Sequence, residues 1–279
     1  MRLEADLTEL TRIARLAAEV IRAVYATPFA VEEKGIGDVV TRADREANDL
    51  ICAALETSFP GEAVVAEESV PTDRATIEAL VRQPRVFYVD PLDGTREFAA
   101  RNGEFAVMIG ISERGHALAG VVLLPVTGQA FVGRVGPGAA AWVEEESGAR
   151  SDLRVTTERD PANARLLVSR SHRPRLVEPF TSRLGLTRLV PCGSVGVKVA
   201  RLASGQADLY VHGGGGASRW DSCAPEAILA GAGGLFTDLD GERIDYADAD
   251  LTLPNGIVAS NGALHPAVLE AIRELRDAR

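Results

Sequence analysis

Long hydrophobic runs are missing from this sequence. None reaches the ~18–20 apolar residues that a membrane-spanning helix needs, and the first 20 residues lack the basic segment and unbroken apolar core of a secretory signal. Cysteine is also scarce, and Cys52, Cys192 and Cys223 form no CxxC pair. A low, odd cysteine count excludes a disulfide framework and suits a reducing compartment. We therefore expect a cytoplasmic, unprocessed protein.

The sequence has no basic stripe either. Its 279 residues include 40 Asp and Glu against 30 Lys and Arg, which gives a formal net charge of −10. An acidic protein repels polyanions, and this argues against nucleic acid polymers and anionic membranes as partners. A small phosphorylated substrate is compatible with this charge if carboxylates recruit divalent metal ions.

The first half of the chain predicts two helices followed by strands. Apolar residues make up 46% of the chain, which excludes a disordered protein. They recur at helical spacing over 3–24 and 47–55. Short apolar runs at 63–66 and 85–91 predict strands that each lead into carboxylates. Runs punctuated by glycine and proline over 104–134 predict an antiparallel meander.

The second half alternates strands and helices, which is typical of an α/β unit. The predicted strands are 164–169, 187–191, 207–211, 233–238 and 256–260. The predicted helices lie near 173–184, 195–204, 221–232 and 263–277. The polar segment 144–152 is the best boundary between the halves. We therefore expect an N-terminal α+β half over 1–148 and a C-terminal α/β half over 149–279.

The hexapeptide from Asp90 to Thr95, DPLDGT, is the most informative motif. Two aspartates three residues apart, with proline between them and glycine after, form a tight turn. Such a turn can direct both carboxylates and the carbonyl of Leu92 at one point, and Mg²⁺ prefers such oxygen ligands. The alternative is that Asp-Pro and Asp-Gly are simply common turn chemistry.

Further carboxylates favour the metal interpretation. Glu67 and Glu68 end a short apolar strand, and ligand sites in α/β proteins gather at strand ends. Asp221 precedes an apolar helix, where it could equally be a helix N-cap. A solvated acidic turn is the corresponding alternative for the glutamates. Together these residues supply enough ligands for two or three metal ions.

Four segments occur in an informative order: GDVVTRADREAN, VVAEES, VDPLDGTREF and RWDSCAPEAILAGAGG. At these distances they resemble the inositol monophosphatase-type superfamily of Mg²⁺-dependent, lithium-sensitive phosphatases. The resemblance covers nearly the whole chain. It implies an α+β or α/β fold, the layered αβαβα sandwich of the inositol monophosphatase-like sugar phosphatases, with the metals between the two halves.

Mapped residue by residue, the resemblance implies that two or three Mg²⁺ ions are bound by Glu67, Asp90, Asp93, Asp221 and the carbonyl of Leu92. It also implies that Asp44 pairs with Thr95 to orient the attacking water, whereas the sequence alone predicts a helix N-cap for Asp44. The N–H groups of Gly94 and Thr95, at the start of a helix, suit a phosphate oxygen. The implied reaction is hydrolysis by metal-activated water without a phosphoenzyme.

Within the superfamily, DGTREF with RNGEF and WDSCAPE resemble the 3′(2′),5′-bisphosphate nucleotidases. This resemblance favours removal of the 3′(2′)-phosphate from bisphosphate nucleotides, with 3′-phosphoadenosine 5′-phosphate giving AMP and phosphate. The residues that fall where the nucleotidases hold the nucleotide and its second phosphate are Ser169, His172, Ser194 and Lys198. Asp221 is also expected to face the substrate, and Arg219 is a supporting candidate.

Lys198 has independent support, because Lys34 is the only other lysine in this arginine-rich chain. A compact ammonium suits a phosphate, and the alternative is a solvated lysine on a helix. His172 either stacks on a base or binds phosphate, or is an ordinary surface residue. With aromatic residues at only 5%, Tyr210 and Trp220 are the candidate stacking platforms for a base.

Two other functions stay open. One is an inositol or sugar phosphate phosphatase of the same fold that serves a dedicated pathway. The other is a catalytically inactive scaffold, against which the retention of the metal carboxylates and of the Asp44 and Thr95 pair argues. A homodimer is common in the superfamily, but the sequence shows no interface.

Overall fold

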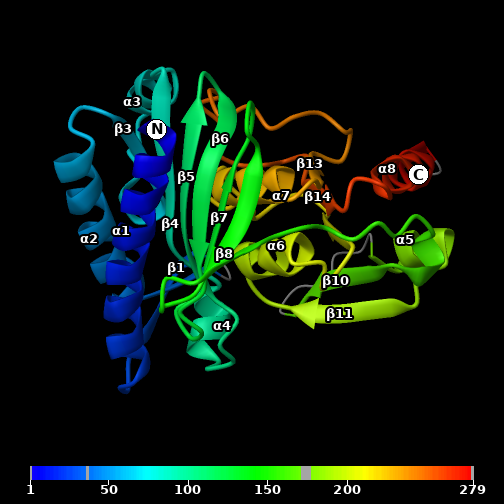
Figure 1. Ribbon diagram of the computed structural model, residues 1–279, viewed down its shortest axis with the longest axis horizontal. Coiled ribbons are helices and arrows are strands. Elements are labelled where there is room, and N and C mark those ends of the chain that lie inside the picture. Colours follow the sequence, from blue (N-terminus) through cyan, green and yellow to red (C-terminus); the bar gives the residue numbers. More distant parts are fainter. Residues whose placement is uncertain (1, 36–37, 171–176, 278–279) are drawn as a thin grey trace.

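The computed structural model describes residues 2–35, 38–170 and 177–277. The chain forms five layers, in which two helices, a seven-stranded sheet, two helices, a five-stranded sheet and two further helices follow one another (Figure 1). This arrangement confirms the predicted αβαβα sandwich.

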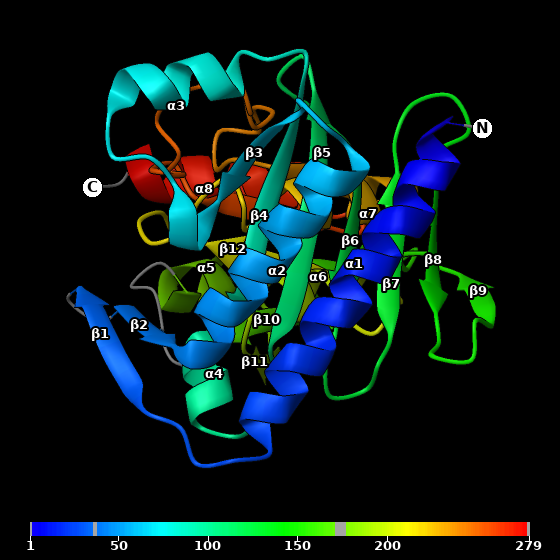
Figure 2. The ribbon, with the colours of Figure 1, turned by 90° about the vertical axis from the view of Figure 1, so that its left-hand side faces the viewer.

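The outer layer on one side consists of α1 (Arg2–Tyr25) and α2 (Arg42–Ser58), which lie side by side across the large sheet (Figure 2). Both are amphipathic, and their apolar faces bury residues such as Leu10 and Ile51 against the sheet. The link between them forms a hairpin of β1 (Val31–Gly35) and β2 (Asp38–Thr41), which the sequence analysis did not predict.

The seven-stranded sheet has its strands in chain order, with β3 and β4 parallel and every other pair antiparallel. This confirms the predicted meander. The strands are β3 (Ala63–Ala66), β4 (Arg85–Asp93), β5 (Ala106–Glu113), β6 (His116–Leu123), β7 (Ala130–Arg134), β8 (Ala140–Glu144) and β9 (Arg150–Asp152). The connections contain η1 (Glu67–Ser69), α3 (Arg74–Val81) and α4 (Thr95–Ala99).

The five-stranded sheet has the order β11-β10-β12-β14-β13, in which β11, β10 and β12 are parallel. Its strands are β10 (Arg165–Ser169), β11 (Arg188–Cys192), β12 (Leu209–His212), β13 (Leu235–Thr237) and β14 (Ile257–Ser260). The remaining elements are η2 (Pro161–Asn163), α5 (Val177–Leu184), α6 (Val195–Ala203), α7 (Cys223–Gly231) and α8 (His265–Asp277). Because β9 still pairs with β8, the large sheet extends past residue 148, and the two-unit division stays a prediction.

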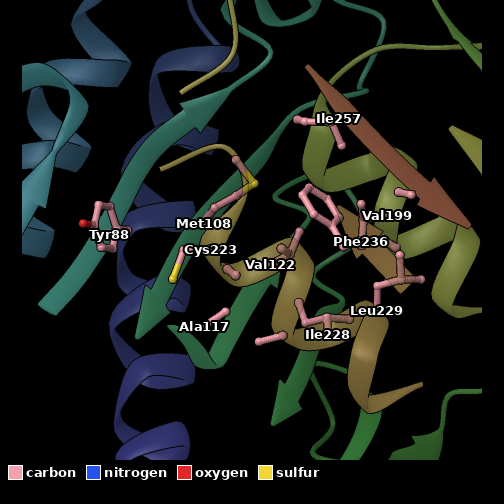
Figure 3. Close-up of a cluster of buried hydrophobic side chains, with 14 of the residues drawn as sticks. Tyr88, Met108, Ala117, Val122, Val199, Cys223, Ile228, Leu229, Phe236 and Ile257 are labelled. Atoms are coloured by element: carbon pink, nitrogen blue, oxygen red, sulfur yellow. The ribbon is translucent and has the colours of Figure 1, made fainter. Parts of the chain in front are cut away.

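Helix α7 packs unusually close to the large sheet. Gly110, Gly120 and Gly133 are neighbours across β5, β6 and β7. A Cβ at these positions would lie 2.6, 2.5 and 2.4 Å from backbone atoms of Ala224, Ala224 and Ile228 in α7. Only glycine therefore permits this contact, which forms part of the core between the sheets (Figure 3). The helix and the polar turn before it are thereby fixed against the sheet.

The three cysteines are free, as the sequence predicts, and the structure buries Cys192 and Cys223. Among the described helices, none combines the length and the apolar character that a membrane crossing requires.

Candidate active site

The pairing of Asp44 with Thr95 joins two elements that are distant in sequence. Asp44 is the third residue of α2, and Thr41, not Asp44, is the N-cap. One carboxylate oxygen, Oδ2, accepts from the N–H and hydroxyl of Thr41 at 2.7 and 2.6 Å in a capping box. The other, Oδ1, accepts from the Thr95 hydroxyl at 2.8 Å. Because Asp44 is only 1% exposed, burial raises the pKa of this carboxyl above its usual value.

The turn after Asp90 has the tight geometry that its composition predicts. The Leu92 N–H donates to Asp90 Oδ1 at 2.9 Å, and the Leu92 carbonyl accepts from the Thr95 hydroxyl at 3.2 Å. Gly94 adopts a left-handed conformation (φ +94°) and caps α4. A Cβ there would lie 2.9 Å from the carbonyl oxygen of Glu104, so both backbone conformation and space require glycine.

Asp90 and Asp221 are brought together at the junction of the two halves. Asp90 lies in the buried part of β4, three residues before the strand ends, and Asp221 lies two residues before α7. Their carboxyl groups share a hydrogen bond, which requires a proton between them. Burial raises the pKa of both carboxyls well above the usual range, and the charges of Glu67 and Asp93 add to the rise. Asp221 further raises the pKa of Asp90, whereas the hydrogen bond with Asp90 opposes the rise at Asp221.

Glu67 at the end of β3 is held by a lysine from the β1–β2 hairpin. Lys34 Nζ lies 3.3 Å from Glu67 Oε1 and also contacts the carboxylate of Glu68. Burial raises the pKa of Glu67 to about 7, and Lys34 opposes this shift. The sequence analysis gave Lys34 no role, although it is one of two lysines in the chain.

Asp93 faces the second half of the chain. Its Oδ2 accepts from the Ser194 hydroxyl at 2.5 Å and from the Gly196 N–H at 2.7 Å. Burial raises the pKa of Asp93, while these donors and the ammonium of Lys198 oppose the rise. Asp93 therefore connects the turn after Asp90 to the start of α6.

Lys198 is buried and not solvated, since the residue is 3% exposed. Its Nζ donates to the Ser194 carbonyl at 3.0 Å and lies 4.9 Å from the ring centre of Tyr210. Burial lowers the pKa of Lys198, and Asp93 partly restores it. Because Tyr210 is 2% exposed and covered by this ammonium, it is not an exposed platform for a base. Trp220 is partly buried against the central core.

Arg219 has a structural use that the sequence did not predict. Its guanidinium donates to the carbonyls of Asp245 and Thr252 at 2.6 and 2.7 Å, and it also contacts the Asp250 carbonyl. The residue is 5% exposed, so its buried guanidinium holds the loop over 245–252 through these hydrogen bonds. The Ser218 N–H next to it donates to Asp221 Oδ2 at 2.7 Å. Arg219 thus supports the segment that positions Asp221.

Among the other predicted substrate residues, Ser169 and Ser194 lie in the same region of the structure. Ser169 ends β10 in register with Cys192, and Ser194 follows two residues later, so the strand ends bring both serines to one region. Ser194 is also the N-cap of α6, where its hydroxyl accepts from the Val197 N–H at 3.0 Å. His172 lies outside the described residues.

The donor set fits a divalent cation by its chemistry. Within the described residues, no group of three or more His, Cys, Asp or Glu side chains is placed so that it could hold a metal ion. Yet the charges of Glu67 and Asp93 both raise the pKa of Asp90 and of Asp221, and Lys34 provides positive charge next to Glu67. Hard oxygen ligands that repel one another are the donors that Mg²⁺ prefers. The ligand assignment, including the Leu92 carbonyl, stays a prediction.

Three comparisons relate this chain to known proteins. The sequence pattern of the inositol monophosphatase family matches residues 3–277. The 3′(2′),5′-bisphosphate nucleotidase CysQ of Escherichia coli K12 is 34% identical over 256 residues, which cover 91% of this chain and 99% of that protein. The human 3′(2′),5′-bisphosphate nucleotidase 1 is 31% identical and covers 84% and 83%. The crystal structure of CysQ from Bacteroides thetaiotaomicron matches with a TM-score of 0.74 at 26% identity, over 92% and 97% of the two chains.

Proposed function

The chain belongs to the inositol monophosphatase family, and we propose that it is a Mg²⁺-dependent phosphomonoesterase that acts on 3′(2′),5′-bisphosphate nucleotides. Its reaction converts 3′-phosphoadenosine 5′-phosphate to AMP and phosphate. The observation that carries this proposal is the partly buried hydrogen bond between Asp44 and Thr95, together with the buried carboxyl pair of Asp90 and Asp221.

Asp44 and Thr95 handle the proton of the attacking water. The Thr95 hydroxyl orients the water and accepts its proton while passing its own proton to Asp44 Oδ1, 2.8 Å away. The raised pKa of Asp44 suits a proton acceptor, and the capping bonds from Thr41 keep the carboxylate in place. Phosphorus is thus attacked directly by water, without a nucleophilic side chain.

The metal ligands in this proposal are Glu67, Asp90, Asp93, Asp221 and the Leu92 carbonyl. Family members are metal-dependent in general. When bound, Mg²⁺ supplies Lewis-acid polarisation and charge neutralisation for the phosphoryl and leaving-group oxygens. The N–H groups of Gly94 and Thr95 at the start of α4 contribute hydrogen bonds to the phosphate.

The second phosphate is assigned to the region around Lys198. Lys198 and Ser194 lie at the start of α6, and Ser169 lies at the end of the adjacent parallel strand. An ammonium has three donor hydrogens, and the Ser194 carbonyl accepts one of them. The names of the two nucleotidase relatives support the same substrate class.

An inositol or sugar phosphate phosphatase of the same fold is the main alternative. The inactive scaffold is disfavoured, because the sequence retains the carboxylates and because Thr95 donates a hydrogen bond to Asp44. The homodimer stays a prediction.

Phosphate release from 3′-phosphoadenosine 5′-phosphate tests the proposal. We expect AMP as the nucleotide product, dependence on added Mg²⁺ and inhibition by Li⁺. Release of the 5′-phosphate instead, or full turnover in excess chelator, would refute it.

A further inference from the structure

Glu104 joins the two halves of the chain next to the proposed substrate site. It follows α4 in the RNGEF segment, to which the reaction assigns no role. Its Oε2 accepts from the Gly193 N–H at 2.8 Å and from Arg170 Nε at 3.0 Å. Its Oε1 accepts from Arg170 Nη2 and Arg201 Nη2, both at 3.1 Å. Both oxygens of one carboxylate are therefore shared by donors from three segments of the second half.

The turn that Glu104 holds is strained. Ser194 adopts φ +55°, a left-handed conformation that is costly for a residue other than glycine. Such a conformation persists only where its surroundings fix it. The hydroxyl of Ser194 is fixed by Asp93 and by the Val197 N–H, and the Cys192–Gly193 peptide is fixed by Glu104 through the Gly193 N–H.

The strained turn in turn positions Lys198. The Ser194 carbonyl accepts the hydrogen bond from Lys198 Nζ. It follows the Gly193 N–H that Glu104 holds by only two residues' backbone, so a change in the backbone angles of Gly193 or Ser194 moves the oxygen that holds the ammonium. Positive charge also gathers here, because Lys198, Arg201 and Arg170 all oppose the burial that raises the pKa of the Cys192 thiol to about 11. Glu104 is the carboxylate that holds both arginines beside this turn.

We propose that Glu104 is a positioning residue for recognition of the substrate's second phosphate, and that it acts by holding the Gly193–Ser194 turn and thereby Lys198. This inference rests on the proposed function, in which Lys198 binds that phosphate. It predicts an effect on the binding of a bisphosphate substrate and little effect on the hydrolytic step.

Glu104→Gln tests the inference with little change of shape. The glutamine amide places donors where one carboxylate oxygen now accepts two hydrogen bonds, so either the Gly193 N–H or an arginine loses its acceptor. We expect the KM for 3′-phosphoadenosine 5′-phosphate to rise about tenfold, in line with loss of a hydrogen bond to a charged group. The expected change in kcat is less than about twofold.

Glu144→Gln is the matched control. The carboxylate of Glu144 also binds two arginines, Arg15 and Arg150, at 3.2 and 2.9 Å. Its side chain is 15% exposed, against 13% for Glu104, but it lies on β8, toward the other edge of the large sheet. We expect this variant to leave both KM and kcat unchanged. Thermal unfolding of both variants measures any common loss of stability.

A double-mutant cycle with Lys198→Ala separates positioning from a general structural role. If Glu104 acts through Lys198, Glu104→Gln changes the KM less than about twofold in the Lys198→Ala background. If Glu104→Gln does not yield folded protein, Glu104→Asp is used, which keeps the charge but shortens the reach and should raise the KM in the same way.

Three results would overturn the inference: a KM no higher than that of Glu144→Gln, a loss of kcat at constant KM, or a full additional effect in the Lys198→Ala background. A wild-type enzyme that does not hydrolyse the bisphosphate would instead overturn the proposed function itself. The wild-type measurement therefore distinguishes the two failures.

Discussion

The hydroxyl of Thr95 donates a 2.8 Å hydrogen bond to Asp44 Oδ1 across 51 residues of sequence. The same carboxylate closes the capping box of α2 through its second oxygen. In the proposed function, this one buried aspartate combines a structural and a chemical role. The two roles predict separable effects of mutation.

Asp44→Asn removes the proton acceptor while an amide oxygen remains for Thr95. We expect kcat to fall by about 10²- to 10⁴-fold, the usual contribution of general base catalysis. Thr41→Ala is the control, because it weakens the same cap at a cost of about 1 kcal/mol but leaves the Thr95 contact. Similar kcat losses in both variants would show that the Asp44 effect is structural.

Gly94→Ala should damage the site through geometry alone. The added Cβ meets the Glu104 carbonyl at 2.9 Å, and the turn that carries Asp93 and Thr95 must shift. We expect kcat/KM to fall at least about 100-fold, as misplacement of a reacting group by about 1 Å can do. Gly61→Ala has a similar φ, +79°, with no atom within 4 Å of the Cβ, and should keep full activity. Normal activity of Gly94→Ala would contradict the proposed turn.

Lys34→Gln should strengthen metal binding. The ammonium contacts Glu67 and Glu68, so a cation bound by Glu67 must compete with it. A partly exposed ion pair is worth about 1 kcal/mol at most, which corresponds to about fivefold in the Mg²⁺ Kd by titration calorimetry. Arg45→Gln removes the exposed ion pair to Glu32 on the same hairpin and should change nothing. Weaker Mg²⁺ binding by Lys34→Gln would show that the lysine supports the metal site.

Glu226 predicts a pH dependence of stability that does not involve the metal ligands. Burial raises the pKa of this carboxyl from 4.5 to about 7, although the Tyr246 hydroxyl donates to it at 2.7 Å. A raised pKa in the folded state gives stability that is fully present below pH 4.5 and is lost as the pH rises through 7.

Glu226→Gln cannot lose this proton. We therefore expect its free energy of unfolding, relative to that of the wild type, to increase between pH 5 and pH 8 by up to about 3 kcal/mol. Denaturant unfolding at both pH values, in the same Mg²⁺ concentration, measures the difference. A relative stability that falls with pH would contradict the assignment of Glu226 as a buried acid.

The sequence predicts the layers because its signals are local. Helical spacing over 3–24 and the punctuated runs over 104–134 agree with α1 and with the meander of β5 to β7. The β1–β2 hairpin was missed, because its segment is mostly polar and exposed and has no clear two-residue alternation. Close packing of α7 was also missed, since it depends on glycines that become neighbours only in the sheet.

The site was predicted chiefly from the motifs that resemble the family. The residues alone did not predict three contacts. Lys34 lies next to Glu67, Glu104 accepts a hydrogen bond from the Gly193 N–H, and Arg219 donates to the Thr252 carbonyl. Each contact joins segments that are far apart in the sequence. The glycine-rich loop at 213–216 lies in the structure beside His212 and Pro254, but base recognition stays unassigned.

The most direct test is the ratio of kcat/KM for 3′-phosphoadenosine 5′-phosphate to that for inositol 1-phosphate, measured with the same enzyme in saturating Mg²⁺. If the second phosphate is bound near Lys198, the ratio should be at least about ten, which corresponds to about 1.4 kcal/mol of transition-state stabilisation. A ratio below one would contradict the account and identify the chain as an inositol phosphate phosphatase.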